Sequence, residues 1–293
     1  MGWLMFFLTI IMYPVLLAMY FVMRAEGKRK GGICFGVAIP QECACDGEME
    51  TIALQYHKKL KRNFIILLLL PVLFFFFSSF SLAYTSWMLW LCLLMVFTVT
   101  PVVWANKKTA QLKRRCLGGD ADDEDRYWKW GLFYHNPQDA HGMVTARVGV
   151  GMAVNLAKPW AKALYGFAAA VILSIPIMSV WLIAEEFTPI YLKCESGVVT
   201  AGQLRENYKI PVSDIEEVEL VNELPVMSKK SGSGFSNLKK GTFHVRNAGD
   251  FETLYNPKNQ YVLYIQTADT SYYLGDASDE GTRAVYDTII KAQ

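Results

Sequence analysis

Residues 63–106 contain the sequence Phe64-Ile-Ile-Leu-Leu-Leu-Leu-Pro-Val-Leu-Phe-Phe-Phe-Phe77 and continue to Val102-Val-Trp104 without an Asp, Glu, Lys, Arg or His. A helix that crosses a membrane needs about 20 apolar residues, each adding about 1.5 Å. This stretch has about twice that length, and serines interrupt its middle. It therefore predicts two transmembrane helices, near residues 64–80 and 86–104, joined by a short turn.

Basic residues flank this apolar stretch on both sides. They are Lys58, Lys59, Lys61 and Arg62 before it, and Lys107, Lys108, Lys113, Arg114 and Arg115 after it. Short loops rich in lysine and arginine lie on the cytoplasmic side of membrane proteins. Both ends of the stretch are therefore expected in the cytoplasm. Because it contains no ionisable residue, this hairpin is expected to anchor the protein rather than conduct an ion.

Two further apolar segments flank the hairpin in the sequence. Residues 1–23 are uncharged and are followed by Arg24, the reverse of the charge order in a cleaved signal peptide. Residues 164–184 are preceded by Lys158 and Lys162 and followed by two glutamates. The sequence thus predicts a four-helix membrane domain, 1–184, with cytoplasmic loops 24–63 and 105–163. The N-terminus and the tail are expected outside the cytoplasm.

The composition is uneven along the chain. The overall net charge is +2, and 53% of the residues are hydrophobic. Residues 188–293 contain eleven basic and fourteen acidic residues, so this tail has a net charge of −3. No basic patch with interleaved aromatic residues stands out, and nucleic-acid binding is not expected.

The second cytoplasmic loop contains Tyr127-Trp-Lys-Trp-Gly-Leu-Phe-Tyr134 and, further on, Arg147-Val-Gly-Val-Gly-Met-Ala-Val-Asn-Leu156. Glycines and β-branched residues are unfavourable in a packed helix. The loop is therefore expected to form short extended segments at the inner membrane surface, with aromatic side chains in contact with the interface. The expected interface residues are Trp128, Trp130, Phe133, Tyr134 and Trp160.

Metal and cofactor sites can be drawn on the loops, but none has the required spacing. A zinc set could be drawn from Cys34, Cys43, Cys45 and His57. Cys-x-Cys is not the usual Cys-x-x-Cys knuckle, so reduced cytoplasmic thiols are the preferred interpretation. The acidic residues within 118–125 lack the EF-hand spacing and are expected to form a solvated linker. Gly149-Val-Gly151 lacks the third glycine of a dinucleotide site. No metal or cofactor is expected.

The tail alternates β-prone runs with turn residues. Strands are expected near residues 190–194, 198–200, 208–210, 215–221, 242–246, 251–255, 261–266 and 271–274. Residues 227–240 are expected to form a flexible Ser/Gly/Lys loop. A final helix is expected after Ser278, which can cap it, with Ala284, Val285, Thr288 and Ile289 on one face. The fold class is therefore a membrane α-helical part plus a soluble α+β domain, 188–293, with an antiparallel sheet closed by a C-terminal helix.

Particular residues of the tail carry a resemblance to a known domain. They are Ile210-Pro-Val-Ser-Asp-Ile-Glu-Glu-Val-Glu219, Leu224-Pro225, the glycines 232, 234 and 241 with Phe243, and Tyr286. In these features the tail resembles bacterial pleckstrin-homology-like (PH-like) domains. The tail is acidic and expected outside, which disfavours phosphoinositide binding.

The membrane part carries a second resemblance. Phe35-Gly-Val-Ala-Ile-Pro40, Tyr127-Trp-Lys-Trp-Gly-Leu-Phe-Tyr-His-Asn-Pro137 and Arg147-Val-Gly-Val-Gly-Met-Ala-Val-Asn155 resemble multi-pass bacterial proteins related to the SdpI immunity family. The resemblance implies a Gram-positive plasma-membrane protein and supplies no catalytic residue. An immunity role is implied by family association alone.

The motifs favour a binding function over catalysis. The four histidines are isolated in the sequence, and no hydrolase or metalloprotease motif is present. We expect a non-enzymatic membrane protein whose tail binds a peptide or protein partner at a strand edge or at the 227–240 loop. The candidate partner-binding residues are Lys229, Lys230, Phe235, Lys239 and Lys240. The alternatives are a transporter or permease-like component and a membrane-associated enzyme without a recognisable motif.

Overall fold

The computed structural model describes residues 2–28, 31–40, 43, 46–117 and 124–292. The chain divides into two compact units. The first, here called the membrane unit, comprises Met1–Ser78 and Ala83–Met178. The second, the C-terminal unit, comprises Ser79–Leu82 and Ser179–Gln293.

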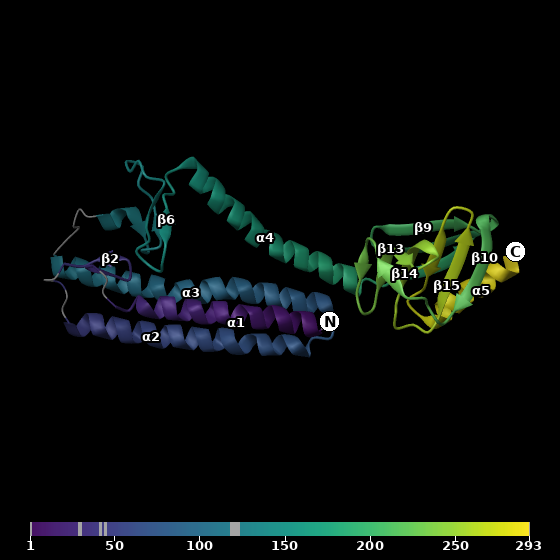
Figure 1. Ribbon diagram of the computed structural model, residues 1–293, viewed down its shortest axis with the longest axis horizontal. Helices are drawn as coiled ribbons and strands as arrows, with labels where there is room; N and C mark the ends of the chain where they lie inside the picture. The colour runs from purple at the N-terminus through teal and green to yellow at the C-terminus, as the bar shows by residue number, and fades with distance from the viewer. Residues whose placement is uncertain (1, 29–30, 41–42, 44–45, 118–123, 293) are drawn as a thin grey trace. The chain divides into compact units, whose positions relative to one another are not determined.

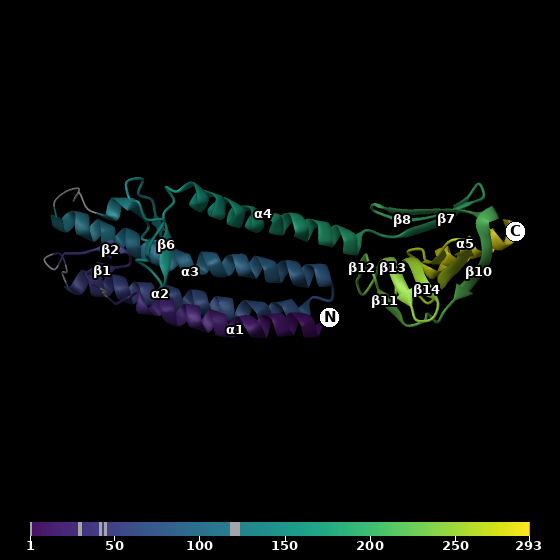
Figure 2. The same cartoon turned by 45° about the horizontal axis from the view of Figure 1, so that its top comes forward.

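Helices α1 (Gly2–Ala25), α2 (Asp46–Leu69) and α3 (Phe80–Leu117) lie side by side in the membrane unit (Figure 1, Figure 2). A 3-10 helix, η2 (Leu70–Phe76), extends α2, and helix α4 (Pro159–Phe187) follows later in the chain. Tyr56, Leu60, Leu67 and Trp90 are fully buried between the helices. The helices thus pack on one stripe of α2 residues three to four positions apart, as helix periodicity requires.

Three helices of the described chain are long and apolar enough to cross a membrane: Phe6–Ala25, Phe80–Leu117 and Pro159–Phe187. Many of their large apolar side chains face outward. Phe7 is 62% exposed, Phe167 69% and Ile177 72%. Surfaces of this extent are unfavourable in water but not in lipid, so these helices are compatible with membrane insertion.

The second expected crossing is not a continuous α-helix. The α-helix ends at Leu69, and residues 70–76 form η2 with Pro71 in its first turn. Proline has no N–H to donate to the carbonyl four residues earlier. That carbonyl, of Leu67, accepts a hydrogen bond from Trp90 Nε1 at 2.9 Å instead. The Leu68 carbonyl accepts one from the Tyr13 hydroxyl at 3.1 Å. Neighbouring helices thus satisfy the carbonyls that the proline frees.

The third helix is longer than expected. The predicted limits were residues 86–104, whereas α3 runs from Phe80 to Leu117 and takes in the start of the expected loop. Only Pro101 lies inside it, and Gly118 is the first glycine after it. The apolar run ends at residue 104, but nothing in residues 105–117 breaks a helix. Hydropathy therefore located the apolar part of this helix and not the helix end.

The basic loops fold into three small antiparallel pairs, and the two pairs of the second loop confirm the short extended segments expected there. They are β1 (Ile33–Cys34) with β2 (Val37–Ala38), β3 (Trp128–Lys129) with β4 (Phe133–Tyr134), and β5 (Met143–Thr145) with β6 (Met152–Val154). Just before β3, the short 3-10 helix η3 (Glu124–Tyr127) carries Asp125.

Asp125 links these loops to α3. It accepts hydrogen bonds from Ala38 N at 3.2 Å and Lys113 Nζ at 2.6 Å, and it forms an ion pair with Arg147. The Arg147 side chain is only 6% exposed. The expectation of a solvated acidic linker is therefore wrong for Asp125, because two buried cations hold it; residues 118–123 lie outside the described residues.

The C-terminal unit contains two sheets and a final helix. The three-stranded sheet has the order β7 (Tyr191–Glu195), β8 (Val198–Gln203), β9 (Glu206–Pro211), and a turn of 3-10 helix, η4 (Val212–Asp214), follows it. The seven-stranded sheet has the order β10 (Ile215–Val221), β15 (Val262–Thr267), β16 (Ser271–Leu274), β14 (Gly249–Tyr255), β13 (Lys239–Val245), β11 (Met227–Lys229), with β12 (Ser233–Gly234) also on β13. Figure 1 shows the larger sheet beside α5 (Asp279–Ala292).

The larger sheet is mixed rather than antiparallel. Strand β14 pairs with β16 in parallel, while β15 and β16 form an antiparallel hairpin. After β14 the chain first forms β15, which leaves one strand position free between β14 and β15. It then returns and fills that position with β16. The insertion of a strand between two earlier positions makes one pair parallel, and local sequence patterns do not encode such an order.

Helix α5 closes the core of the C-terminal unit. Ser278 Oγ accepts a hydrogen bond from Gly281 N at 3.1 Å, which confirms the expected cap. Val285 and Ile289 are buried as expected, in one apolar cluster with residues of both sheets such as Leu192 and Leu263. Ala284 and Thr288 are exposed, which corrects the predicted face. The buried face instead contains Thr282 at the position three residues before Val285.

Candidate functional site

The segment of residues 227–240 is part of the sheet and not a flexible loop. Strand β11 pairs with β13 with Met227 opposite Val245 and Lys229 opposite Phe243. The chain then crosses and pairs with β13 again through β12, where Ser233 lies opposite Lys240. The expectation of flexibility was wrong, because the glycines and serines of this segment are part of the two strand pairings with β13.

Two glycines make the crossing possible. Gly232 has a φ of +98°, and a Cβ atom on it would lie 2.1 Å from the Lys240 carbonyl oxygen. Gly241 has a φ of +105°, and its Cβ would lie 2.7 Å from the Ser231 carbonyl oxygen. No other residue type allows both this backbone conformation and this approach.

Strand β11 ends the larger sheet, and its outer edge is the candidate site. Lys230 N donates to Thr242 O at 3.1 Å, which makes Lys230 a hydrogen-bonded position of the pair. Such positions alternate with non-hydrogen-bonded ones in antiparallel pairs. The peptide groups of Met227 and Lys229 therefore point away from β13. The preceding residue, Val226, is 93% exposed. An outward row of donors and acceptors beside an exposed apolar side chain can pair with another strand.

Charged side chains surround this edge. Lys230 Nζ lies 2.5 Å from Asp250 Oδ2, and His244 Nδ1 lies 2.8 Å from Asp250 Oδ1. These contacts, first with Lys230 and then with His244, lower the pKa of the Asp250 carboxyl group. The same hydrogen bond raises the pKa of Lys230. Asp250 thus stays ionised and contacts Lys230 and His244 on the surface.

The structure separates the five predicted partner-binding residues. Lys229 and Lys230 are exposed at the β11 edge. Lys239 lies 5.9 Å from the centres of the Phe243 and Tyr255 rings, and Phe235 packs against the core. Lys240 is buried in an ion pair with Glu185. Lys240 is therefore a structural residue and not a surface contact, because its charge is already neutralised inside the unit.

The same segment holds the end of α4. Ser233 Oγ donates to Glu185 Oε1 at 3.2 Å, and Asn237 Nδ2 donates to the Glu186 carbonyl at 2.7 Å. Gln203 Nε2 donates to the carbonyls of Glu185 and Thr188 at 2.9 and 2.8 Å. These bonds satisfy carbonyls that the end of a helix leaves without an intrahelical partner. The sequence interpretation used the two glutamates only as orientation markers and missed this role.

The predicted interface aromatics lie in two environments. Trp130 and Trp160 are 37% and 46% exposed, and Phe133 is half-buried. Trp128 lies beneath the Arg147 guanidinium, 5.1 Å from the ring centre. Tyr134 is buried, and its hydroxyl donates to Asp139 Oδ2 at 2.9 Å. The structure thus leaves Trp130, Trp160 and Phe133 available for interfacial contact and uses the other two inside the loops.

Two of the cysteines of the first loop are in the hydrophobic core of the membrane unit. Cys34 and Cys43 are buried there, and Cys45 lies outside the described residues. Within the described part of the chain, no group of three or more His, Cys, Asp or Glu residues is placed to hold a metal ion.

The order of strands followed by a capping helix is what the PH-like resemblance implied. A family model described as the bacterial PH domain matches residues 192–276. The match starts in β7 and ends just after β16, so it contains both sheets and the β11 edge. It supports the prediction of a PH-like domain in the tail. Neither the comparison with curated proteins nor that with solved structures found a match.

Proposed function

We propose that the protein is a non-enzymatic membrane protein whose PH-like domain binds an extended segment of a peptide or protein by adding it to β11 as a further strand. The observation that carries this proposal is the open edge at Met227 and Lys229, whose peptide groups point away from β13. Main-chain hydrogen bonds supply the affinity in strand addition, and neighbouring side chains supply the selectivity. Val226 offers an apolar contact, and Lys229 offers a positive charge.

In this proposal the domain lies outside the cytoplasm on a four-crossing plasma-membrane anchor. The α-helical residues 63–69 and the seven residues of η2 together rise roughly 25 Å at about 1.5 and 2.0 Å per residue. The hydrocarbon core of a bilayer is about 30 Å thick. The bonds from Tyr13 and Trp90 place this run beside α1 and α3, which supports a crossing at the same depth. The relation of residues 1–184 to the SdpI family stays a prediction.

One group of residues in the C-terminal unit bears on an enzymatic role. Ser228, His244 and Asp250 are neighbours across three strands, and the imidazole contacts the carboxylate. The Ser228 hydroxyl donates to the main-chain carbonyl of His244 at 3.4 Å and not to its ring. A serine nucleophile needs the imidazole as its base, so the geometry favours binding.

The test uses proline as a probe of the outward peptide groups. Peptides that bind the purified full-length protein in detergent are selected from a library of displayed random heptapeptides. Lys229→Pro removes the outward N–H of β11 and leaves the ladder to β13 intact, because edge strands tolerate proline at such positions. We expect this variant to lower the affinity for the selected peptides at least tenfold. A loss of about this size follows when one hydrogen bond is removed and its partner stays buried.

Lys229→Thr is the matched control. It keeps the peptide N–H and removes the charge, so most of the affinity should remain. Equal melting temperatures of both variants and the native protein would show that the sheet is intact. Full affinity of Lys229→Pro would refute strand addition, and loss of binding in both variants would assign recognition to the lysine side chain.

A further inference from the structure

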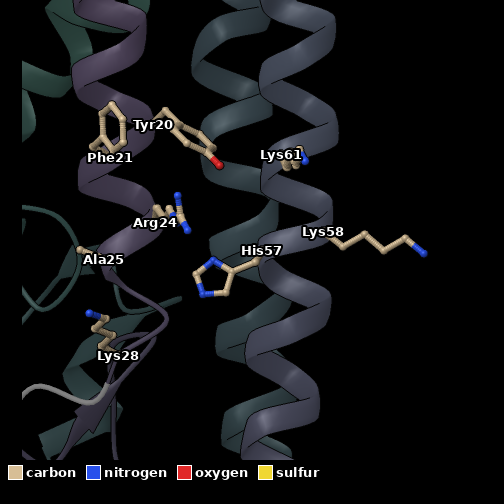
Figure 3. Close-up of a pocket in the computed structure, with 8 residues that line it drawn as sticks. All are labelled: Tyr20, Phe21, Arg24, Ala25, Lys28, His57, Lys58 and Lys61. Atoms are coloured by element: carbon tan, nitrogen blue, oxygen red, sulfur yellow. The ribbon is translucent and has the colours of Figure 1, made fainter.

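A groove with four cationic side chains lies between the C-terminal end of α1 and the middle of α2, far in sequence from the PH-like domain (Figure 3). Its volume is about 810 Å³. Tyr20 and Arg24 are one turn apart on α1, and His57 and Lys61 are one turn apart on α2. Residues four apart lie on one face of a helix, so two short stripes face each other across the groove.

The charge of the groove is strongly positive. Arg24, Lys28, Lys58 and Lys61 line it. Glu26, two residues after Arg24 in the chain, is 3% exposed and acts electrostatically on Tyr56. Figure 3 shows Arg24 and the His57 ring directed into the space between the helices, whereas Lys58 extends away from α1. Arg24 and His57 therefore point into the groove, and Lys61, one turn from His57 on α2, is a further cation that lines it.

The groove also has an apolar side. Tyr20 and Phe21 line it one turn from Arg24, toward the apolar body of α1. Phe21 is 61% exposed, and Leu17, one turn further, is 49% exposed. Aromatic residues next to cations mark the level of the lipid headgroups. A ligand that occupies the groove thus meets cations at one end and an outward apolar helix surface at the other.

We propose that this groove binds the headgroup of an anionic phospholipid, with the phosphate between Arg24 and Lys61 and the acyl chains along Leu17 and Phe21. The guanidinium of Arg24 provides paired N–H donors for phosphate oxygens. Basic pockets between membrane helices are suited to anionic headgroups. A free phosphate would use the same cations but would leave the exposed apolar surface uncovered, which favours the lipid.

His57 fits this role through its packing. A Cβ atom on Gly27 would lie 2.4 Å from His57 Nε2, so the chain after α1 passes close to this ring. Partial burial, followed by the charge of Arg24, lowers the pKa of His57. The neutral imidazole thus adds a hydrogen bond without adding to the repulsion among the cations.

The test measures lipid binding to the full-length protein in a neutral maltoside detergent by isothermal titration calorimetry. The probes are dihexanoyl phosphatidylglycerol, dihexanoyl phosphatidylcholine, glycerophosphoglycerol and inorganic phosphate. We expect phosphatidylglycerol to bind at least tenfold more tightly than the other three. The double variant R24Q/K61Q should bind phosphatidylglycerol at least tenfold more weakly than the native protein. This is about the effect of losing one charge-assisted hydrogen bond.

The control variant K107Q/K108Q removes the same charge from exposed positions of α3 that do not line the groove. It should bind phosphatidylglycerol like the native protein. An equal loss in the control, or equal binding of phosphatidylcholine, would overturn the proposal. If inorganic phosphate bound as tightly as phosphatidylglycerol, the groove would be a site for a soluble anion, and the proposal of a lipid site would be overturned. Arg24 and Lys61 are exposed, so an unchanged melting temperature without lipid separates lost binding from lost folding.

Discussion

Lys240 shows how burial changes the role of a charged residue. Its side chain is 7% exposed and that of its partner Glu185 is 4% exposed. A buried ion pair adds little net stability, but the removal of one partner leaves a charge without compensation in a medium of low dielectric. The pair therefore fixes how the end of α4 docks on β12 and β13.

Lys240→Met should lower the free energy of unfolding of the C-terminal unit by about 3–5 kcal/mol. Hydrogen exchange of the β13 amides in the full-length protein measures this loss. Lys229→Met removes an exposed lysine from the same segment and should change the stability by less than about 0.5 kcal/mol. The double variant E185L/K240M should recover most of the stability; a double variant as unstable as the single one would show that the charge is not the cause.

His57 provides a pH-dependent prediction in the membrane unit. Its folded pKa is lower than the ordinary value of 6.5, first through burial and then through Arg24. The unfolded chain therefore takes up a proton at higher pH than the folded one. The contribution to stability is present above pH 6.5 and is lost as the pH falls from 6.5 to the folded pKa.

Arg24→Gln should raise the pKa of His57 toward 6.5 and narrow that pH range. The titration of the His57 ring signals by NMR measures the change directly. Lys107→Gln is the control and should leave the titration unaltered. A pKa that does not move in Arg24→Gln would show that burial alone lowers it.

At the scale of the element, the α2–η2 segment depends on a side chain of α3. The Trp90 indole donates to the Leu67 carbonyl that Pro71 leaves free. Trp87 is three residues earlier on the same helix and is also buried, but its Nε1 has no hydrogen-bond partner in the described structure. The two tryptophans are therefore both buried on α3 but differ in hydrogen bonding.

Trp90→Phe should destabilise the membrane unit by about 1 kcal/mol more than Trp87→Phe, the scale of one hydrogen bond between membrane helices. Unfolding of the purified protein by increasing fractions of sodium dodecyl sulfate measures the difference. Equal losses in the two variants would mean that packing alone, and not the bond to Leu67, accounts for the effect.

The crossing of β11 and β12 over β13 provides a second prediction for an element. Gly232→Ala places a methyl group against the Lys240 carbonyl at a strained φ and should cost about 1–3 kcal/mol or more. Gly234, two residues further, has no positive φ, and its nearest neighbour to an added Cβ is the flexible Lys229 Cδ at 3.9 Å. Gly234→Ala should therefore be nearly neutral. Thermal unfolding of both variants tests the contrast, and similar melting temperatures would contradict the close crossing.

For the whole molecule, the α2–η2 segment determines which side of the membrane holds the tail. With three crossings the two ends of the chain lie on opposite sides, and with four they lie on the same side. The basic residues after α1 and before α4 favour an N-terminus and a tail outside. We therefore expect alkaline phosphatase fused after Gln293 to be active in cells, and a fluorescent protein inserted in residues 118–123 to fluoresce. An inactive phosphatase fusion at normal expression would contradict four crossings.

Much of this architecture could be predicted from local sequence patterns. Hydropathy located the apolar helices, β-propensity located most strands of the tail, and Ser278 marked the start of α5. These patterns reflect interactions of a residue with solvent, lipid or its nearest neighbours in the chain. The candidate site could be predicted only in part, since Lys229 and Lys230 lie at the open edge and Lys240 does not.

The sequence by itself determined the apolar helices with their basic flanks and most strands of the tail, because burial in lipid and strand propensity depend on residue type. Only the tertiary structure decided that residues 227–240 are strands, that β14 and β16 are parallel, and that Glu185 neutralises Lys240. It also decided that Trp90 replaces the donor that Pro71 lacks, and that Arg24 and Lys61 face one groove. Each of these features joins residues that are distant in the chain, and their contact energies arise only when the fold brings them together.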